Sequence, residues 1–199
     1  MNVLIAGSTG NTGLRLSNQL ADAGHDVIAL HRESSDTSKL PANAQLRQAD
    51  LTDLSDEVCE GADVVVFAAG SGGGTSEEMT DKVDRDGAKS LIDKAAKAGA
   101  SRFVMLSSVG AGDPDPESEL ANYLQAKHDA DEYLKASGLS YTIVRPVSLT
   151  DDDGQRNVRL GDDVDPSGKA ARGDVAAILA RAVTDDAMLN KTFLMESMG

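Results

Sequence analysis

Three evenly spaced glycines near the N-terminus form a segment that suits phosphate binding. Gly7, Gly10 and Gly13 follow the apolar run 2–6 and precede a helical pattern of leucines, so backbone N–H groups of the segment would lie at a helix N-terminus. Gly7 would permit the tight turn, Gly10 the close approach of a phosphate, and Gly13 close packing of helix on strand. The predicted phosphate-binding residues are Gly7, Ser8, Thr9, Gly10, Asn11, Thr12 and Gly13.

The spacing of these glycines differs from the common dinucleotide-binding fingerprint, because it reads GxxGxxG and not GxGxxG. A glycine-rich turn without a ligand is the alternative interpretation. The strand before the segment, the helix after it and the alternation of strands and helices along the chain favour a dinucleotide, whose pyrophosphate would meet the helix N-terminus.

The residue types at the end of the second predicted strand indicate whether NAD or NADP binds. An acidic residue at this point commonly binds the ribose 2′-OH of NAD. Here His31 takes that position and Arg32 follows, and a guanidinium group suits the 2′-phosphate of NADP. Arg15 is a second candidate for this phosphate. We therefore predict NADP; the alternatives are NAD, if Glu33 places a carboxylate on the ribose, and a purely solvated Arg32.

Tyr123 and Lys127 are the principal candidates for acid–base chemistry. They lie four residues apart in a predicted helix, so their side chains share one face. A lysine cation stabilises a neighbouring phenolate, which eases proton transfer near neutral pH, and the same lysine can hold a nicotinamide ribose. Ser107 or Ser108, at the end of a predicted strand, would hydrogen-bond a substrate carbonyl or hydroxyl group. In the alternative, Tyr123 packs its ring at the helix edge and Lys127 is a solvated charge.

Short apolar strands alternate with helical patterns along the chain, which is typical of a parallel sheet covered by helices on both faces. The sequence therefore predicts an α/β fold, a Rossmann-type doubly wound parallel sheet, in a single domain of residues 1–199 with a small C-terminal segment on the substrate side. The predicted strands are 2–6, 27–30, 44–47, 64–68, 102–106, 140–144 and 192–195. One predicted helix begins after Gly13, and the others span 53–60, 77–98, 119–137 and 173–184.

Loops at the carboxyl ends of the strands should surround the ligands, because the crevice of an open parallel sheet lies there. The loops in question are Gly70–Ser76, Gly110–Glu117 and Asp151–Gly168. The glycines at 72–74 fit a substrate lid as well as an ordinary surface loop. Asp50 and Leu51, just past the third predicted strand, are placed to flank an adenine ring, Asp50 through the amino group and Leu51 by packing.

The composition excludes several classes of function. The chain has 199 residues with 40% hydrophobic content, enough for one sizeable core, and its net charge of -14 repels nucleic-acid backbones and anionic membrane surfaces. The longest apolar run, 64–69, is far too short to span a membrane. One cysteine, Cys59, and three histidines form neither a disulfide nor a recognisable metal site, so we expect no metal and a reducing, cytoplasmic setting. The aspartate runs fit a halophilic source or simply a well-solvated surface.

Several segments together resemble a known family. They are GSTGNTG after the first strand, ALHR at the second, RFVMLSSVGA at the fifth, YLQAK on the next helix, SYTIVRPVSLTD at the sixth strand and ARGDVAAILARAV near the C-terminus. Over nearly the whole chain, these segments look like the atypical short-chain dehydrogenase/reductases of the NAD(P)H-binding type. Small bacterial NAD(P)-binding or sugar-epimerase-like proteins are the nearest in pattern, and biliverdin-IXβ/flavin reductases and nitrogen-metabolite sensors are more distant.

The resemblance implies further site residues and a reaction type. Ala68, Ala69 and Gly70 resemble the segment that passes along the cofactor ribose, and Pro146 and Val147 resemble the segment that borders the nicotinamide. The expected function is an NADP-preferring oxidoreductase that transfers hydride between nicotinamide and a small carbonyl-type or quinone/flavin-like acceptor. A non-catalytic NADP-binding redox sensor and an epimerase-like enzyme with retained cofactor are the alternatives. The substrate and the oligomeric state are not indicated.

Overall fold

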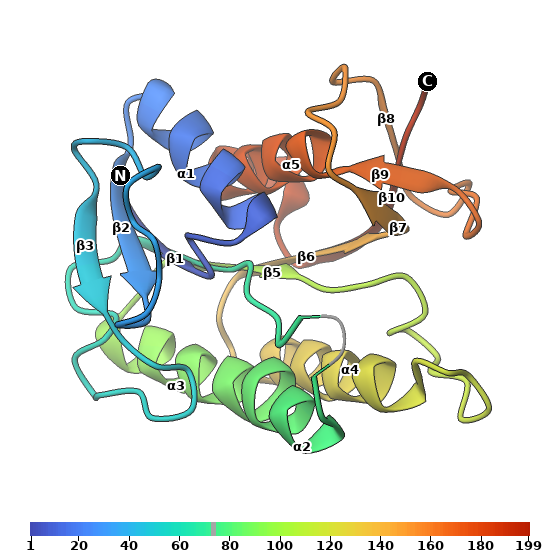
Figure 1. Ribbon diagram of the computed structural model, residues 1–199, viewed down its shortest axis with the longest axis horizontal. Coiled ribbons are helices and arrows are strands. Elements are labelled where there is room, and N and C mark those ends of the chain that lie inside the picture. The colour runs from blue at the N-terminus through green and yellow to red at the C-terminus, as the bar shows by residue number, and fades with distance from the viewer. Residues whose placement is uncertain (73–74) are drawn as a thin grey trace.

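The computed structural model describes residues 1–72 and 75–199, and within them eight strands form one central sheet in the order β3-β2-β1-β4-β5-β6-β10-β8 (Figure 1). All neighbouring strands run parallel except β8, which pairs antiparallel with β10 at one edge. The strands are β1 (Asn2–Ala6), β2 (Asp26–His31), β3 (Gln45–Gln48), β4 (Val64–Phe67), β5 (Arg102–Leu106), β6 (Tyr141–Pro146), β8 (Val158–Leu160) and β10 (Lys191–Ser197). Two short strands, β7 (Ser148–Thr150) and β9 (Lys169–Ala171), pair separately.

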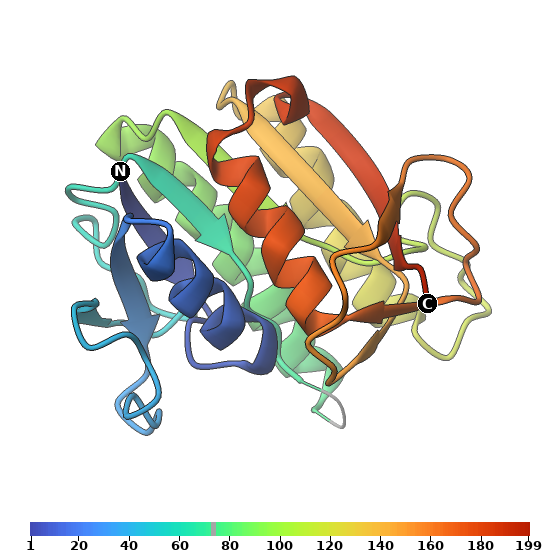
Figure 2. The same cartoon turned by 90° about the horizontal axis from the view of Figure 1, so that it is seen from above.

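Helices cover both faces of the sheet. Helices α1 (Asn11–Asp22) and α5 (Arg172–Thr184) lie side by side on one face (Figure 2). On the other face lie α2 (Glu77–Thr80), α3 (Ala88–Ala98) and α4 (Ala121–Ala136). A short 3-10 helix, η2 (Asp186–Met188), precedes the last strand. The predicted doubly wound α/β fold is confirmed.

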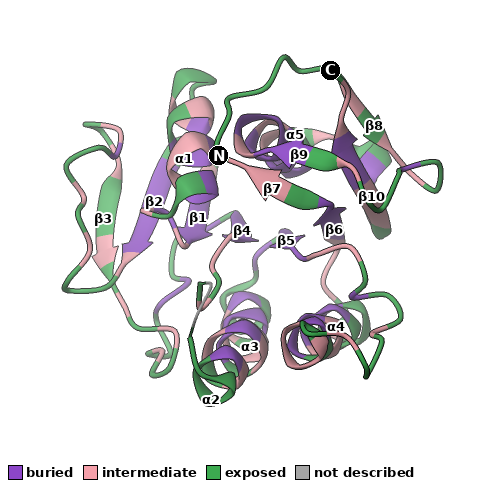
Figure 3. Cartoon of the chain, turned by 45° about the vertical axis from the view of Figure 1, so that its right-hand side comes forward, coloured by how far each residue is buried: buried purple, intermediate pink, exposed green. Residues whose placement is uncertain are grey.

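The apolar composition of the central strands follows from their burial on both sides. Every residue of β4 and β5 is buried, and β1 is buried from its second residue onward. Side chains that alternate along these strands enter two cores, one under α1 and α5 and the other over α3 and α4. Strand β3, at the edge, is largely exposed (Figure 3), which explains its polar sequence.

The middle of the helical segment after β4 has π-helical geometry. The sequence pattern predicts one continuous helix over 77–98, and the chain does remain helical there, but Asp81–Gly87 form a π-helical stretch, η1, between α2 and α3. Gly87 lies against Leu51, since a Cβ at Gly87 would come 2.9 Å from the Leu51 carbonyl oxygen. π-helical insertions widen a helix locally and often occur at functional sites.

Two structural predictions are wrong. The segment 53–60 forms a series of turns and no helix, because few of its side chains are buried and its backbone bonds, such as Glu60 N–H to the Glu57 carbonyl, span three residues. The segment 151–168 is not simply a loop, because it contains β8, whose backbone pairs with the far edge of β10. Alternation over three residues is too short a pattern to reveal such an edge strand.

Candidate active site

The glycine segment forms a tight turn between β1 and α1, at the point where the order of the strands reverses. Gly7 has φ +81°, and a Cβ there would lie 2.7 Å from the backbone of Ala69 after β4. A Cβ at Gly13 would lie 2.0 Å from the Gly7 carbonyl oxygen. The turn and the close packing predicted for these two glycines are therefore present, and the β1 and β4 loops touch at the sheet's switch point.

Gly10 has a different environment from Gly13, which separates binding from folding. Gly10 is the N-cap of α1, provides no side chain to the first turn and has φ -75°, and a Cβ there would make a tight contact of 3.3 Å with the Gly7 carbonyl oxygen, much less severe than the 2.0 Å overlap at Gly13. The N–H groups of the first turn have no partner within the helix. This open helix N-terminus fits the pyrophosphate of a dinucleotide.

We expect Gly13→Ala to lower the free energy of unfolding by about 1–3 kcal/mol or more, because the methyl group collides with backbone. Gly10→Ala should cost less stability than Gly13→Ala and should weaken nicotinamide dinucleotide binding, since the methyl group enters the space of the phosphate. Urea denaturation and calorimetric titration of both variants measure the two effects. Equal stability of the two variants would contradict the assigned packing role of Gly13.

A cavity of about 680 Å³ opens beside this turn at the carboxyl ends of the strands. The turn after β1, the loop after β4, the end of β5 and the beginning of α4 line it. The structure thereby brings together residues that the sequence analysis took from four separate segments. The predicted residues in its lining are Gly10, Asn11, Thr12, Ala68, Ala69, Gly70, Ser107, Tyr123 and Lys127.

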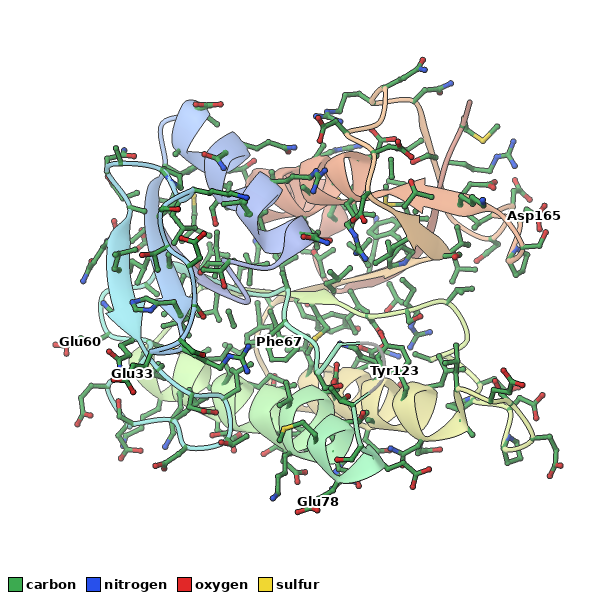
Figure 4. All side chains as sticks on the ribbon, viewed as in Figure 1. Glu33, Glu60, Phe67, Glu78, Tyr123 and Asp165 are labelled. Atoms are coloured by element: carbon green, nitrogen blue, oxygen red, sulfur yellow. The ribbon has the colours of Figure 1, made fainter. Side chains whose placement is uncertain are left out.

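Tyr123 and Lys127 lie on one face of α4, as predicted, and point into this cavity. Figure 4 places Tyr123 at the beginning of α4, between this helix and the sheet. The Lys127 ammonium lies 5.7 Å from the centre of the Tyr123 ring and 5.4 Å from that of Phe67. Lys127 is only 2% exposed, so the alternative that it is a solvated charge is wrong.

Lys127 is held by a buried aspartate that the sequence analysis did not identify. Its Nζ lies 3.0 Å from Oδ1 of Asp84, and it also donates to the backbone carbonyls of Ala69 and Leu106 at 3.4 Å. The second oxygen of Asp84 accepts the backbone N–H of Ser71 at 2.9 Å. Burial lowers the pKa of Lys127, but the charges of Tyr123 and Asp84 outweigh burial and raise this pKa above its ordinary value. Lys127 is therefore a fixed cation on the cavity floor.

Asp84 reaches this position because it lies in the π-helical stretch η1. Its side chain is fully buried between the loop after β4 and α4, and a Cβ at Gly70 would come within 3.3 Å of its carboxylate. In the sequence, Asp84 is one of three acidic residues in the charged segment Asp81–Gly87, which has the composition of a solvent-exposed face. Only its burial could have identified Asp84 as a site residue, and that burial depends on tertiary contacts that the local sequence does not show.

Ser107 has a different set of partners from the one predicted. Its hydroxyl donates to Oδ2 of buried Asp131 at 2.7 Å, and the same oxygen accepts from Nε of Arg145 at 3.0 Å, with Nη2 of Arg145 in ion-pair contact at 2.9 Å. Burial raises the pKa of Asp131, although Ser107 and Arg145 act against this shift. Because the Ser107 proton is engaged, its oxygen can accept but not readily donate toward the cavity. Ser108 is half-buried and lies outside the lining, so the two serines are not equivalent.

The predicted adenosine end lies on an open surface beyond this cavity. His31 is half-exposed and Arg32 exposed at the end of β2. The backbone N–H and hydroxyl of Thr52, with a smaller contribution from the charge of Arg32, hold the pKa of Asp50 below its usual range. Figure 4 shows Glu33 on this side of the molecule, far from Tyr123.

Four predicted residues do not present free polar groups to the cavity: two make hydrogen bonds elsewhere and two are buried. The Ser8 hydroxyl donates to the Leu30 carbonyl at 2.6 Å and is buried, so Ser8 cannot reach a ligand with its side chain. All three nitrogens of the Arg15 guanidinium have partners, among them Asp153 at 2.8 Å, so its assignment to a 2′-phosphate is not supported. Pro146 and Val147 are buried at the end of β6 and do not line the cavity.

The remaining predicted residues do not line the cavity. Gly7, Thr9 and Gly13 belong to the turn, and Leu51 packs against the core over α3 and α4. Cys59 is buried, and burial raises the pKa of its thiol to about 11, which fits a packing residue. Gly73 and Gly74 of the predicted lid lie outside the described residues. Within those described, no group of three or more potential metal ligands occurs, and no helix has the length and apolarity to cross a membrane.

The comparison with protein families supports the cofactor class that this geometry suggests. The family described as NAD(P)H-binding matches residues 7–186, from the first glycine of the turn to the end of the last crossover. The chain belongs to the NAD(P)H-binding family. This membership agrees with the resemblance of the sequence to the atypical short-chain dehydrogenase/reductases.

Individual relatives of this NAD(P)H-binding chain carry names of two kinds. The uncharacterized sugar epimerase YhfK of Bacillus subtilis is 36% identical, over 97% of this chain and 92% of the relative. A solved structure from Bacillus halodurans, named provisionally as an NAD-dependent epimerase/dehydratase, has 34% identity and a TM-score of 0.91, over 100% of this chain and 94% of that one. Sanguinarine reductase of Eschscholzia californica is 27% identical, over 97% and 88%. The family is thus oxidoreductase-like, and binds a nicotinamide cofactor.

Proposed function

We propose that the chain is an NADP-preferring oxidoreductase that transfers a hydride between nicotinamide and a small carbonyl-type, quinone or flavin-like acceptor. The observation that carries the proposal is the Tyr123, Lys127 and Asp84 arrangement on the floor of a cavity whose other end is the phosphate-binding turn. A cofactor with its pyrophosphate at the N-terminus of α1 would have room to extend along Ala69 and Gly70 toward Tyr123. A relative named sanguinarine reductase supports this reading.

The chain's own residues supply proton transfer and placement. The bound nicotinamide would supply the hydride. Tyr123 donates a proton to the acceptor oxygen, and the Lys127 cation stabilises the phenolate that remains. Lys127 keeps its position because Asp84 and two backbone carbonyls hold it, so the catalytic pair is organised before a substrate arrives.

The charges at the mouth of the cavity favour an uncharged acceptor over a nucleotide sugar. Glu77 and Glu119 line the mouth, and both are exposed. Of the two cations in the described lining, Lys127 is paired with Asp84, and Arg172 borders the N-terminus of α1, where the cofactor pyrophosphate would lie. A diphosphate group on the substrate would therefore meet carboxylates without a free cation at the mouth. This argues for a reductase acting on small acceptors, although relatives carry epimerase names.

The proposed setting is cytoplasmic, with neither nucleic acid nor membrane as a partner. The net charge of -14 repels both polyanionic surfaces. The buried free thiol of Cys59 suits a reducing compartment, where NADPH is the common reductant.

Calorimetric titration with NADPH and NADH tests the cofactor preference. We expect wild-type protein to bind NADPH at least about tenfold more tightly than NADH, because a guanidinium–phosphate contact contributes on the order of 1.5–3 kcal/mol. Arg32→Ala should abolish this preference and leave NADH binding unchanged. Equal affinities in the wild type would remove Arg32 from the site and direct attention to Glu33.

Oxidation of NADPH with neutral quinones, aldehydes and free flavin as acceptors tests turnover. Loss of absorbance at the nicotinamide band that depends on one of these acceptors supports the oxidoreductase. Tight binding of NADPH without oxidation by any acceptor would instead assign the chain to the redox-sensor class.

A further inference from the structure

A guanidinium group from a distant part of the sequence borders the phosphate-binding turn. Arg172 is the first residue of α5, and its side chain lines the same cavity as Gly10, Asn11 and Thr12. Helices α1 and α5 lie side by side over the sheet (Figure 2), which brings their N-terminal ends to the same edge. The sequence analysis did not identify Arg172, because 159 residues separate it from Gly13 in the chain.

One carboxylate oxygen links Arg172 to the beginning of α1. Oδ1 of Asp151 accepts from Nε of Arg172 at 2.7 Å and from Nδ2 of Asn11 at 3.1 Å. This contact fixes the guanidinium plane through its Nε. Among the described residues, no hydrogen bond is found for the two terminal nitrogens of Arg172, which are the pair that binds phosphate oxygens in a forked geometry.

The pyrophosphate needs a cation that the turn itself does not contain. The segment Gly7–Gly13 has no lysine or arginine, and the protein as a whole repels anions. Arg15, the nearest basic residue in the sequence, has all of its guanidinium nitrogens engaged by Asn11, Asp151 and Asp153. Lys127 is paired with Asp84 on the floor of the cavity. Arg172 is the cation whose terminal nitrogens are available at this end.

We propose that Arg172 is a binding residue for the cofactor pyrophosphate, held in position by Asp151. This inference rests on the proposed dinucleotide cofactor and adds a residue of α5 to its site. The guanidinium lies beside the first residue of α1 and contributes charge-assisted hydrogen bonds, so the diphosphate meets both a helix N-terminus and a cation anchored by Asp151. Because NAD and NADP share the pyrophosphate, Arg172 strengthens the binding of both.

Calorimetric titration of apo-protein with NADPH and with NADH tests this role. Arg172→Ala should weaken both cofactors about tenfold or more, and by the same factor. Arg32→Ala should weaken NADPH alone. Arg181→Ala is the matched control, because Arg181 lies on the same helix, is more than half exposed and pairs with Asp185 away from the cavity. It should change neither affinity.

Further readouts separate a binding role from a structural one. Arg172→Gln keeps an amide donor toward Asp151 and lacks the charge, so it should weaken both cofactors while the melting temperature of the apo-protein stays at the wild-type value. Unchanged affinity in Arg172→Gln, or a loss confined to NADPH, would overturn the inference and leave the proposed function intact. If wild-type protein bound neither NADPH nor NADH, the proposed function and this inference would both be wrong.

Discussion

Replacing Tyr123 with phenylalanine should lower kcat by about 10²- to 10⁴-fold for whichever acceptor the protein reduces, and leave the affinity for NADPH nearly unchanged. A positioned general acid contributes an acceleration of this order. The ring of Tyr123 and its packing near Lys127 persist in the variant, so only the hydroxyl is lost. Steady-state kinetics with NADPH and a neutral quinone or aldehyde measure the effect.

Tyr133 offers a matched control for this variant on the same helix. Its hydroxyl donates to Asp93 on the outer surface, away from the cavity. Tyr133→Phe should therefore retain wild-type kcat. If Tyr123→Phe retained full turnover with a genuine acceptor, protonation by Tyr123 would be wrong, and the acceptor would be one that takes its proton from water, as a flavin or quinone can.

The local sequence could predict those parts of the site that are determined by residues close together in the chain. The glycine turn is one, because Gly7 and Gly13 are required by a positive φ and by contact within a few residues. The shared face of Tyr123 and Lys127 is another, since helical spacing alone determines it. The parallel sheet with helices on both faces is a third, because its apolar strands alternate with helical segments along the chain.

The parts that escaped prediction depend on contacts between segments distant in the chain. Asp84 belongs to a charged segment whose sequence looks solvent-exposed, and Arg172 begins a largely apolar helix far along the chain from the glycine turn; each becomes a site residue only when its helix packs beside the cavity. Likewise, nothing near Ser107 in the sequence indicates that Asp131 accepts a hydrogen bond from its hydroxyl. The engagement of Arg15, the second candidate for the 2′-phosphate, escaped prediction for the same reason, because its partners Asp151 and Asp153 lie far along the chain.

The ion pair of Lys127 and Asp84 should be the most sensitive position for stability. Lys127→Met leaves the Asp84 carboxylate buried without its cation, and breaking a buried pair in this way typically lowers the free energy of unfolding by about 3–5 kcal/mol. Turnover should be lost as well. Lys135→Met on the same helix is the control, because Lys135 pairs with Glu132 at the surface and should have little effect.

The double variant Lys127→Met/Asp84→Asn distinguishes a charge effect from a packing effect. If the loss in Lys127→Met arises from the unpaired carboxylate, then removing that carboxylate restores much of the stability, and the two substitutions are strongly non-additive in urea denaturation. The raised pKa of Lys127 sets the pH range of the experiment. Because the folded pKa lies above the unfolded value of about 10.4, the stabilising charge is fully present below that pH and is lost only as the pH rises through the folded pKa. The difference between wild type and Lys127→Met should therefore be constant between pH 7 and 9. Additive substitutions would show that the Lys127 side chain stabilises the fold by packing against Phe67 and Tyr123, and that its charge is present for catalysis alone.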